Sequence, residues 1–334
     1  MAEVMELPEL AAPLAAAPLA FRPAIALALT QHADGSWSDA MLTLPAPRSP
    51  HFQGVGTIPA VRRLTEYGWA KDAPPIHQAR RPLFRLLAED ESPAVLYEFG
   101  GTAGEDEDLV RRGRAILRDA SAAALAQAGF DADPRVRGAG KRILTRAVDY
   151  LRSPLAQKPF VRVGNQHVLA GEAAPPSIYG LAALAWLPSY RIEFHEEMEV
   201  LYHHLAQPVP RMDPVQQCGA TMVEQPQLVL GDMLGSRHVA DTDLPFALHW
   251  LELMARLGFL TRNEGWLKLF ERLLDHCDAS GLWKPGKGAV VPKEANPFAW
   301  HMWPLDPEHP DGVADVSFRL GLIGKLIGWQ VELT

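Results

Sequence analysis

Apolar side chains recur every three or four residues along most of this chain, which is the spacing of one face of an α-helix. In the segment 57–69, for example, Ile58, Val61, Leu64 and Tyr67 follow one another at intervals of three. Alternation of apolar and polar residues, the pattern of a half-buried strand, is scarce. The pattern predicts helices over 57–69, 76–90, 106–130, 133–154, 177–188, 191–207, 243–259, 264–278 and 315–329.

Caps and breakers mark where several of these helices begin and end. Acidic residues open the segment 106–130, which stops at Gly129, and the next helix has Asp133 as its N-cap and Pro134 at its first position. These two helices predict an antiparallel hairpin. The segments 243–259 and 264–278 predict a second one.

Two stretches lack a clear helical period. We expect the segment 157–176 to be a loop with a short β-hairpin, and 208–241 to be irregular with one short helix at 226–235. In total, about twelve helices pair into about six hairpins, and each amphipathic hairpin needs neighbours to cover its apolar face. We therefore predict a single all-α domain over 1–334.

Composition and charge narrow the class of protein. Apolar residues make up 48% of the 334 residues and charged residues 22%, as in globular proteins. The net charge of -8 argues against a nucleic-acid-binding surface, because no basic excess exists to neutralise phosphates. Basic residues gather at 111–118 and 135–142, where acidic neighbours favour solvated helix faces.

The N-terminal segment is apolar, but it begins with glutamates and is interrupted by prolines, so it is a poor signal peptide. We expect no transmembrane segment and a cytoplasmic protein. Cys218 and Cys277 lie far apart in sequence and form no zinc-binding pattern, so we expect no structural zinc and no cofactor.

One short motif occurs twice. The stretch QHADGSW (31–37) follows an apolar segment with a polar turn, a glycine, one further residue and a tryptophan, and DASGLW (278–283) does the same. Glycine permits a turn with positive φ, and the tryptophan can then pack across the adjoining helix ends. We expect Gln31, Gly35 and Trp37 to lie at a turn between helices, with Trp37 buried.

QHADGSW resembles the Gln-x-x-x-Gly-x-Trp core of the QW repeat of squalene and hopene cyclases, and TIPAVRRLTEYGW (57–69) is similar to the helix that follows such a turn. GLWKPGK (281–287) resembles a stretch of protein prenyltransferase β-subunits. The resemblance implies an (α/α)6 toroid of the terpenoid cyclase/protein prenyltransferase superfamily. It also implies an isoprenoid or other apolar substrate in a central cavity, with a partner subunit or a homo-oligomer as further expectations. A HEAT-like superhelix of the same hairpins is the structural alternative.

In class II terpene cyclases, the middle aspartate of Asp-x-Asp-Asp protonates the substrate. Two imperfect copies occur here, Asp131 with Asp133 and Asp241 with Asp243, and these four are the candidate catalytic residues. Such an acid must stay protonated, through burial or a neighbouring carboxylate. The alternative is that Asp133 and Asp243 only cap helices. A single toroid would also supply only half of the cyclase cleft.

A prenyltransferase-type zinc site would need an aspartate two residues before a cysteine, which neither Cys218 nor Cys277 has. His195, Glu199 and His203 lie on one stripe of the helix 191–207 and offer another metal-binding hypothesis. The rise of about 1.5 Å per residue lets one ion reach only two of them. A polar helix face with His–Glu pairs is the alternative.

Aromatic residues crowd the C-terminal part of the chain, where they suit an apolar pocket or pack a core. The candidate substrate-binding residues are Trp283, Phe298, Trp300, His301, Trp303 and Phe318. Three functions therefore stay open: an isoprenoid-handling enzyme, a non-catalytic toroid that binds a small molecule or a protein, and a metal-assisted enzyme using the helix at 195–203.

Overall fold

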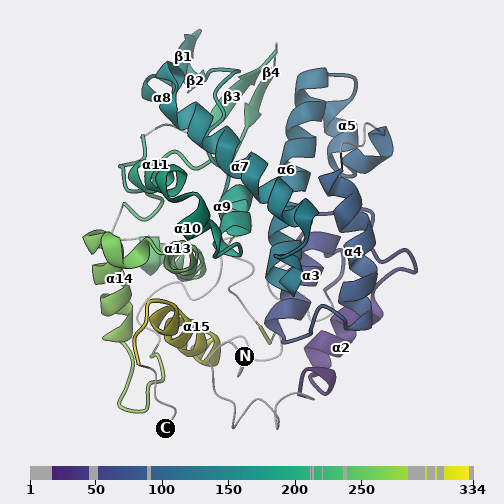
Figure 1. Cartoon of the computed structure of the whole chain (residues 1–334), viewed down its shortest axis with the longest axis vertical. Coiled ribbons are helices and arrows are strands. Elements are labelled where there is room, and N and C mark those ends of the chain that lie inside the picture. The colour runs from purple at the N-terminus through teal and green to yellow at the C-terminus, as the bar shows by residue number, and fades with distance from the viewer. Residues whose placement is uncertain are drawn as a thin grey trace. The chain divides into compact units, whose positions relative to one another are not determined.

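The structure is a computed structural model. It describes residues 17–44, 52–88, 92–210, 212, 214–219, 221–235, 239–284, 298, 305–306 and 312–330. The chain divides into two compact units. Unit 1 takes residues 1–83, 127–129 and 236–334, and unit 2 takes residues 84–126 and 130–235. Figure 1 shows the elements of both.

The regular elements among the described residues of unit 1 are helices. Its elements are η1 (Ala17–Leu19), α2 (Arg22–Leu29), α3 (Thr57–Glu66), the first part of α4 (Pro74–Leu87), α12 (Val239–Thr242), α13 (Leu244–Arg256), η4 (Leu260–Arg262), α14 (Glu264–Leu274) and α15 (Val313–Leu326). The predicted helices at 57–69, 76–90, 243–259, 264–278 and 315–329 are confirmed within the described residues, with the bounds given above. The hairpin of α13 and α14 packs through Trp250 and Trp266, whose ring centroids lie 6.1 Å apart.

The turn between α2 and α3 has the predicted form. Trp37 is 1% exposed, and its ring N–H donates to the carbonyl of Leu27 at 2.8 Å. Gln31 closes the turn, because its amide donates to the carbonyls of Gly35 at 3.0 Å and Pro75 at 2.8 Å. Gly35 has a φ of 91°, which favours glycine. The expectation of a buried Trp37 at a glycine turn is therefore confirmed.

The second copy of the motif shares the glycine turn, the buried tryptophan and one backbone contact with the first. Gly281 has a φ of 76° and Trp283 is 5% exposed. The backbone N–H of Trp283 donates to the hydroxyl of Ser317 at 2.8 Å, just as that of Trp37 donates to the hydroxyl of Thr57 at 3.0 Å. In both copies a hydroxyl on the helix that follows thus fixes the tryptophan backbone.

Unit 2 combines helices with a small sheet. Its elements are the end of α4, η2 (Pro93–Leu96), α5 (Phe99–Ala103), α6 (Glu107–Leu125), α7 (Pro134–Arg152), α8 (Pro154–Gln157), β1 (Phe160–Val163), β2 (Gln166–Leu169), α9 (Ile178–Ala185), α10 (Tyr190–Glu193), α11 (His195–Leu205), β3 (Val215–Cys218) and β4 (Thr221–Glu224). The π-helical turn η3 (Ala126–Phe130) lies in the connection between α6 and α7.

The hairpin of α6 and α7 begins and ends as its caps predict. The Asp106 carboxylate accepts the N–H groups of Asp108 and Leu109, at 2.9 and 3.1 Å, and so caps α6. Gly129 has a φ of 88° in the connection, and Asp133 caps α7. A run of buried alanines on α6, at 120 and 122–124, lets the helix α9 pack closely against it.

The prediction of an all-α (α/α)6 toroid is wrong, because unit 2 contains a four-stranded sheet in the order β1-β2-β3-β4. The pairs β1–β2 and β3–β4 are antiparallel hairpins, while β2 and β3 pair in parallel through Leu169 and Gln216. The strands lie together beside α8 in Figure 1. The hairpin expected within 157–176 is confirmed, and the short helix expected at 226–235 is absent.

The physical reason is the length of the strands. Each has four residues, so each shows at most two residues per face, too few to display a period of two. The parallel pairing also joins segments that are distant in sequence, which no local pattern can reveal. Hydrophobic periodicity therefore predicted the long helices but not the mixed sheet.

Candidate functional site

A cleft of about 770 Å³ opens in unit 2. We call it the arginine cleft, because four of its lining residues are arginines. It is bounded by α6, by α7, by the segment 171–177 and by the strands β3 and β4 with the residues after them. Its lining residues are Asp108, Arg111, Arg112, Ala115, Ile116, Arg118, Asp119, Arg146, Gly171, Glu172, Ala173, Ala174, Pro175, Ser177, Gln216, Gly219, Gln225, Gln227 and Leu228.

The helix α6 supplies most of the charge. Asp108, Arg112, Ala115 and Asp119 follow at intervals of three or four and therefore share one helix face. That face lines the cleft, whereas Leu117 on another face is fully buried. The arginines of 111–118 thus differ in environment, since the side chain of Arg111 is 77% exposed and that of Arg112 only 18%.

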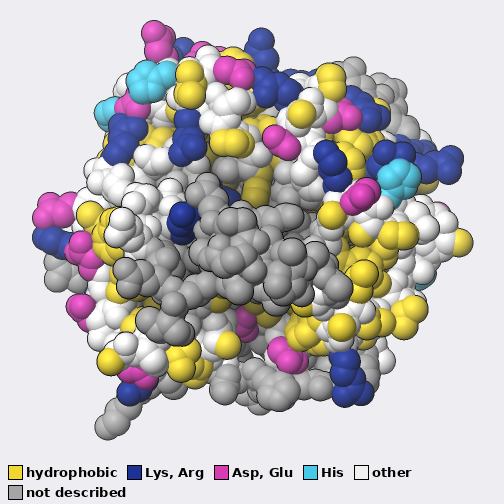
Figure 2. All heavy atoms as spheres, turned by 60° about the horizontal axis from the view of Figure 1, so that its bottom comes forward, with side chains coloured by type: hydrophobic (Ala, Val, Ile, Leu, Met, Phe, Trp, Pro, Cys, Tyr) yellow, Lys and Arg dark blue, Asp and Glu magenta, His cyan; other side chains and the backbone are white. Residues whose placement is uncertain are grey.

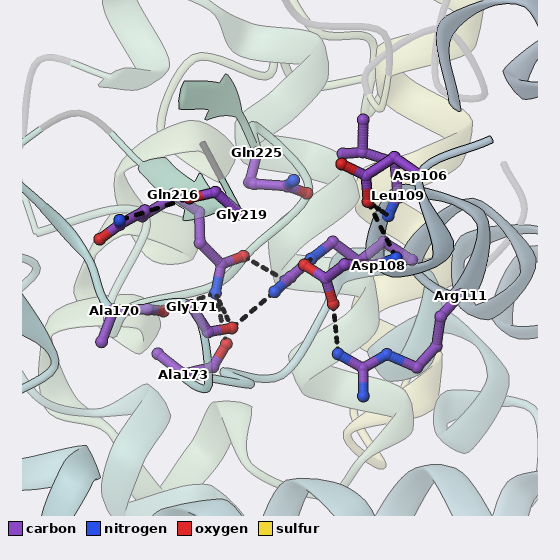
Figure 3. Close-up of polar contacts among 12 residues, drawn as sticks. Asp106, Asp108, Leu109, Arg111, Ala170, Gly171, Ala173, Gln216, Gly219 and Gln225 are labelled. Carbon is purple, nitrogen blue, oxygen red and sulfur yellow. Dashed lines mark hydrogen bonds and ion pairs between the residues drawn. The ribbon is translucent and has the colours of Figure 1, made fainter. Parts of the chain in front are cut away.

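Arg112 joins three parts of unit 2, and its partners Asp108, Gly171 and Gln216 are labelled in Figure 3. Its guanidinium donates to the Asp108 carboxylate at 2.8 Å, to the Gln216 side-chain oxygen at 2.7 Å and to the Gly171 carbonyl at 2.5 Å. The Gln216 amide in turn donates to the carbonyls of Ala170 and Ala173, at 2.9 and 2.6 Å. Burial alone would raise the pKa of Asp108, but the hydrogen bonds from Arg112 and Arg111 lower it. Arg112 therefore shapes the wall of the cleft.

A second ion pair lies deeper in the cleft. The Asp119 side chain is 5% exposed, and its Oδ2 accepts hydrogen bonds from Arg146 at 2.5 Å and from the Ser177 hydroxyl at 3.0 Å. Ser177 also caps α9, because its oxygen accepts the N–H of Gly180 at 3.0 Å. Burial raises the pKa of Asp119, and the Arg146 guanidinium and the Ser177 hydroxyl oppose that rise.

Two arginines of the cleft use few of their donors. Within the described part of the chain, Arg118 donates only to the carbonyl of Ala88, at 3.4 Å, and Arg146 only to Asp119. A guanidinium carries five N–H donors in a planar arrangement that matches a carboxylate or a phosphate. Arg118 and Arg146 can therefore bind an anion without giving up their protein contacts.

The sequence-predicted acids lie elsewhere. Asp133 accepts the backbone N–H of Arg135 at 2.9 Å and pairs with its guanidinium, and these hydrogen bonds lower the pKa of Asp133. These contacts agree with the alternative that Asp133 caps the helix α7. Asp131 is half-buried in the turn before α7.

In unit 1, Asp243 is 6% exposed and caps α13, where its carboxylate accepts the N–H of Phe246 at 3.3 Å. Asp241 lies in α12, and its side chain is outside the described part. The structure thus gives both N-cap aspartates, Asp133 and Asp243, a capping contact. The catalytic role of the four aspartates stays a prediction.

The predicted substrate-binding aromatics fall in unit 1 and are described only in part. Trp283 and Phe298 are buried, at 5% and 8% exposure, and Phe318 is half-buried on α15. Trp300, His301 and Trp303 lie outside the described residues. The aromatic pocket therefore stays a prediction.

The stripe on α11 is described in full. His195 and His203 are exposed, and the Nδ1 atom of His203 lies 2.7 Å from the carbonyl oxygen of Glu199 in the same helix. Among the residues with described placement, no three His, Cys, Asp or Glu side chains gather in an arrangement that could hold a metal ion. The metal-assisted hypothesis therefore rests on the sequence spacing alone.

Unit 1 holds a buried charged cluster that the sequence did not indicate. Arg63 and Arg319 are 0% and 3% exposed, and both approach Glu66 Oε2, at 3.4 and 3.9 Å. Burial raises the pKa of Glu66 against the opposing charge of Arg63, and it also raises the pKa of Asp315 against that of Arg319. The cluster was missed because α3 is buried on nearly every side, and only its apolar stripe was read as core.

Comparison with protein-family models, with curated proteins and with solved structures gave no match. Among the described helices, none combines the length and the apolar character that crossing a bilayer requires. Figure 2 shows acidic and basic side chains interspersed over the described part of one face of the molecule. The fold and the cleft thus define a mostly helical protein with a concave, arginine-lined site.

Proposed function

We propose that this protein binds a small organic anion in the arginine cleft. The observation that carries the proposal is the pair Arg118 and Arg146, which line a cavity of about 770 Å³ and keep most of their donors available. Cavities of this size typically hold small-molecule ligands. Ala115, Ile116 and Leu228 add apolar lining for the body of such a ligand. Small-molecule binding, one of the functions that the sequence suggested, is the function that this geometry supports best.

The donors of the cleft, more than its net charge, suit a phosphate. Asp108 and Asp119 are engaged with arginines, and Arg111 and Glu172 are both exposed and therefore hydrated, so Arg118 supplies the remaining positive charge. A phosphate monoester has three oxygens that accept hydrogen bonds and can use donors of both Arg118 and Arg146.

The resemblance to isoprenoid-handling proteins suggests the first probe, because an isoprenoid diphosphate is an organic anion. Binding of farnesyl diphosphate, inorganic pyrophosphate and palmitate would be measured by isothermal titration calorimetry.

The cysteines Cys218 and Cys277 are both free thiols, which fits the expected cytoplasmic location.

Arg118→Gln is the decisive variant, since it removes a charge without breaking an ion pair. We expect it to weaken anion binding by about ten-fold or more, as for the loss of one charged hydrogen bond. Arg152→Gln, on the same helix as Arg146 but outside the cleft lining, is the matched control and should bind as the wild type does. If none of the probes binds, or if Arg118→Gln binds them unchanged, the proposal is wrong.

A second candidate function is acid-catalysed conversion of an apolar substrate. Glu66 and Asp315 are its candidate acids, because burial raises the pKa of both carboxyls. Mass spectrometry of squalene and related polyenes incubated with the protein would test it. Turnover that Glu66→Gln abolishes, with the fold intact by circular dichroism, would support a role of Glu66. Absence of turnover by the wild type would count against the candidate.

A further inference from the structure

A second depression adjoins the arginine cleft. It has a volume of about 1080 Å³ and runs along one face of α7, and we call it the α7 groove. Its walls come from α7, from the residues that follow this helix and from the segment with Glu172 and Ala174. Arg146, Glu172 and Ala174 line both depressions. The groove and the cleft therefore adjoin, and Arg146 lies at their boundary.

The two ends of the α7 groove differ in chemistry. Lys141 and Arg142 lie on the N-terminal side of Arg146, whereas the C-terminal side has Tyr150, Pro154 and Leu155, together with Ser153 and the exposed Asp149. Leu155 packs against the core cluster that Tyr150 forms with Leu169, Ala170 and Ala173, so this part of the floor is fixed by the core. An apolar chain that starts at Arg146 meets apolar side chains in one direction and cationic ones in the other.

We infer that the ligand of the arginine cleft is an amphipathic anion. Its charged group lies at Arg118 and Arg146, and its apolar chain lies in the α7 groove over Tyr150, Pro154 and Leu155. This inference rests on the proposed anion binding. It adds the class of ligand and the direction of the chain.

A series of n-alkyl phosphates tests the inference, because the head group stays constant while the chain grows. Dissociation constants of inorganic phosphate and of butyl, hexyl and octyl phosphate would be measured by calorimetry, each below its micelle concentration. A fully buried methylene strengthens binding by about four-fold, and a groove open on one side should retain roughly two-fold for each methylene. We expect this chain-length dependence in the wild-type protein.

Leu155→Gln places a polar group of similar size on the floor of the groove. We expect it to flatten the chain-length dependence while butyl phosphate binds nearly as before. Pro154→Ser, at an exposed position of the same floor, is the second variant and should act in the same direction even if Leu155→Gln folds poorly. Arg142→Gln, at the other end of the groove, is the matched control and should keep the wild-type dependence on chain length.

The outcomes separate the inference from the proposed function. If neither inorganic phosphate nor any alkyl phosphate binds, both are overturned. If the phosphates bind with the same affinity at every chain length, anion binding stands and the inference is wrong. The inference is also wrong if the dependence survives in both Leu155→Gln and Pro154→Ser, or if only Arg142→Gln removes it.

Discussion

Alanine substitutions at Gly35 and Gly281 should have unequal effects, although the two glycines occupy equivalent places in the repeated motif. Both have positive φ, 91° and 76°. At Gly35 an added Cβ would lie 2.5 Å from the carbonyl oxygen of Gln78 and 2.7 Å from its carbonyl carbon. At Gly281 it would meet no heavy atom within 4 Å among the described residues. The pair therefore separates the cost of the backbone conformation from the cost of the contact.

The magnitudes follow from these two costs. Placing a Cβ in the left-handed region costs about 1–2 kcal/mol, and alanine returns roughly 0.4–1 kcal/mol by restricting the unfolded chain. Gly281→Ala should therefore destabilise unit 1 by about 1 kcal/mol. Gly35→Ala should add about 1–3 kcal/mol of overpacking, because backbone of α4, and not a flexible side chain, occupies the position.

Urea unfolding followed by tryptophan fluorescence measures this difference in one unit, since every tryptophan except Trp186 falls within the ranges of unit 1. Comparison of the two variants cancels their shared backbone cost. If Gly35→Ala and Gly281→Ala destabilise the protein equally, the close approach of Gln78 does not explain the glycine at position 35.

Two further predictions concern charged groups. The first compares the free energy of unfolding of the wild type with that of Glu66→Gln. The difference, wild type minus variant, should fall as pH rises above 4.5, the ordinary pKa of glutamate. It falls because the carboxyl of Glu66 keeps its proton to higher pH in the folded state than in the unfolded chain. This difference should fall by about 1.4 kcal/mol for each pH unit over which Glu66 is protonated only in the folded state. A difference that rises with pH would mean that Arg63 keeps Glu66 ionised. Arg112→Met removes three hydrogen bonds and should weaken the protection of the β3 amides against hydrogen exchange by about 2–4 kcal/mol. Arg111→Met, at an exposed side chain, should change it by less than about 0.5 kcal/mol, and equal effects would contradict the assigned role of Arg112.

Local sequence signals predicted the long helices because their causes are local. The periodic apolar face of α7, its N-cap Asp133 and the left-handed Gly129 before it act within a few residues of one another. The burial of Trp37 was also predictable, because a glycine turn after an apolar helix leaves the tryptophan next to helix ends. The sheet was not predictable in full, because the pairing of Leu169 with Gln216 depends on how distant segments meet.

The arginine cleft was missed for a different reason. The run 111–118 was read as one solvated basic face, but successive residues of a helix point about 100° apart. Arg111 therefore faces solvent while Arg112 lies against Gln216. A signal was present in Asp119, a carboxylate beside a long run of small apolar residues, since a buried carboxylate needs a partner. That partner, Arg146, comes from the neighbouring helix and could not be read from α6 alone.

Asp119 bears on how Arg146 binds an anion, through two opposing effects. Its negative charge reduces the positive potential in the arginine cleft, which by itself weakens binding. It also fixes the guanidinium of Arg146, a side chain that is 46% exposed, through a contact of 2.5 Å, and Ser177 fixes Asp119 in turn. Ordering a long side chain on binding costs about 0.5–1.5 kcal/mol of free energy. The ion pair with Asp119 already orders the side chain of Arg146 in the folded protein, so binding of the anion does not include this cost. Arg118 supplies further positive charge, so the cleft still attracts an anion. Arg146 uses only one hydrogen bond for Asp119, so its guanidinium is held in place and keeps donors for the anion.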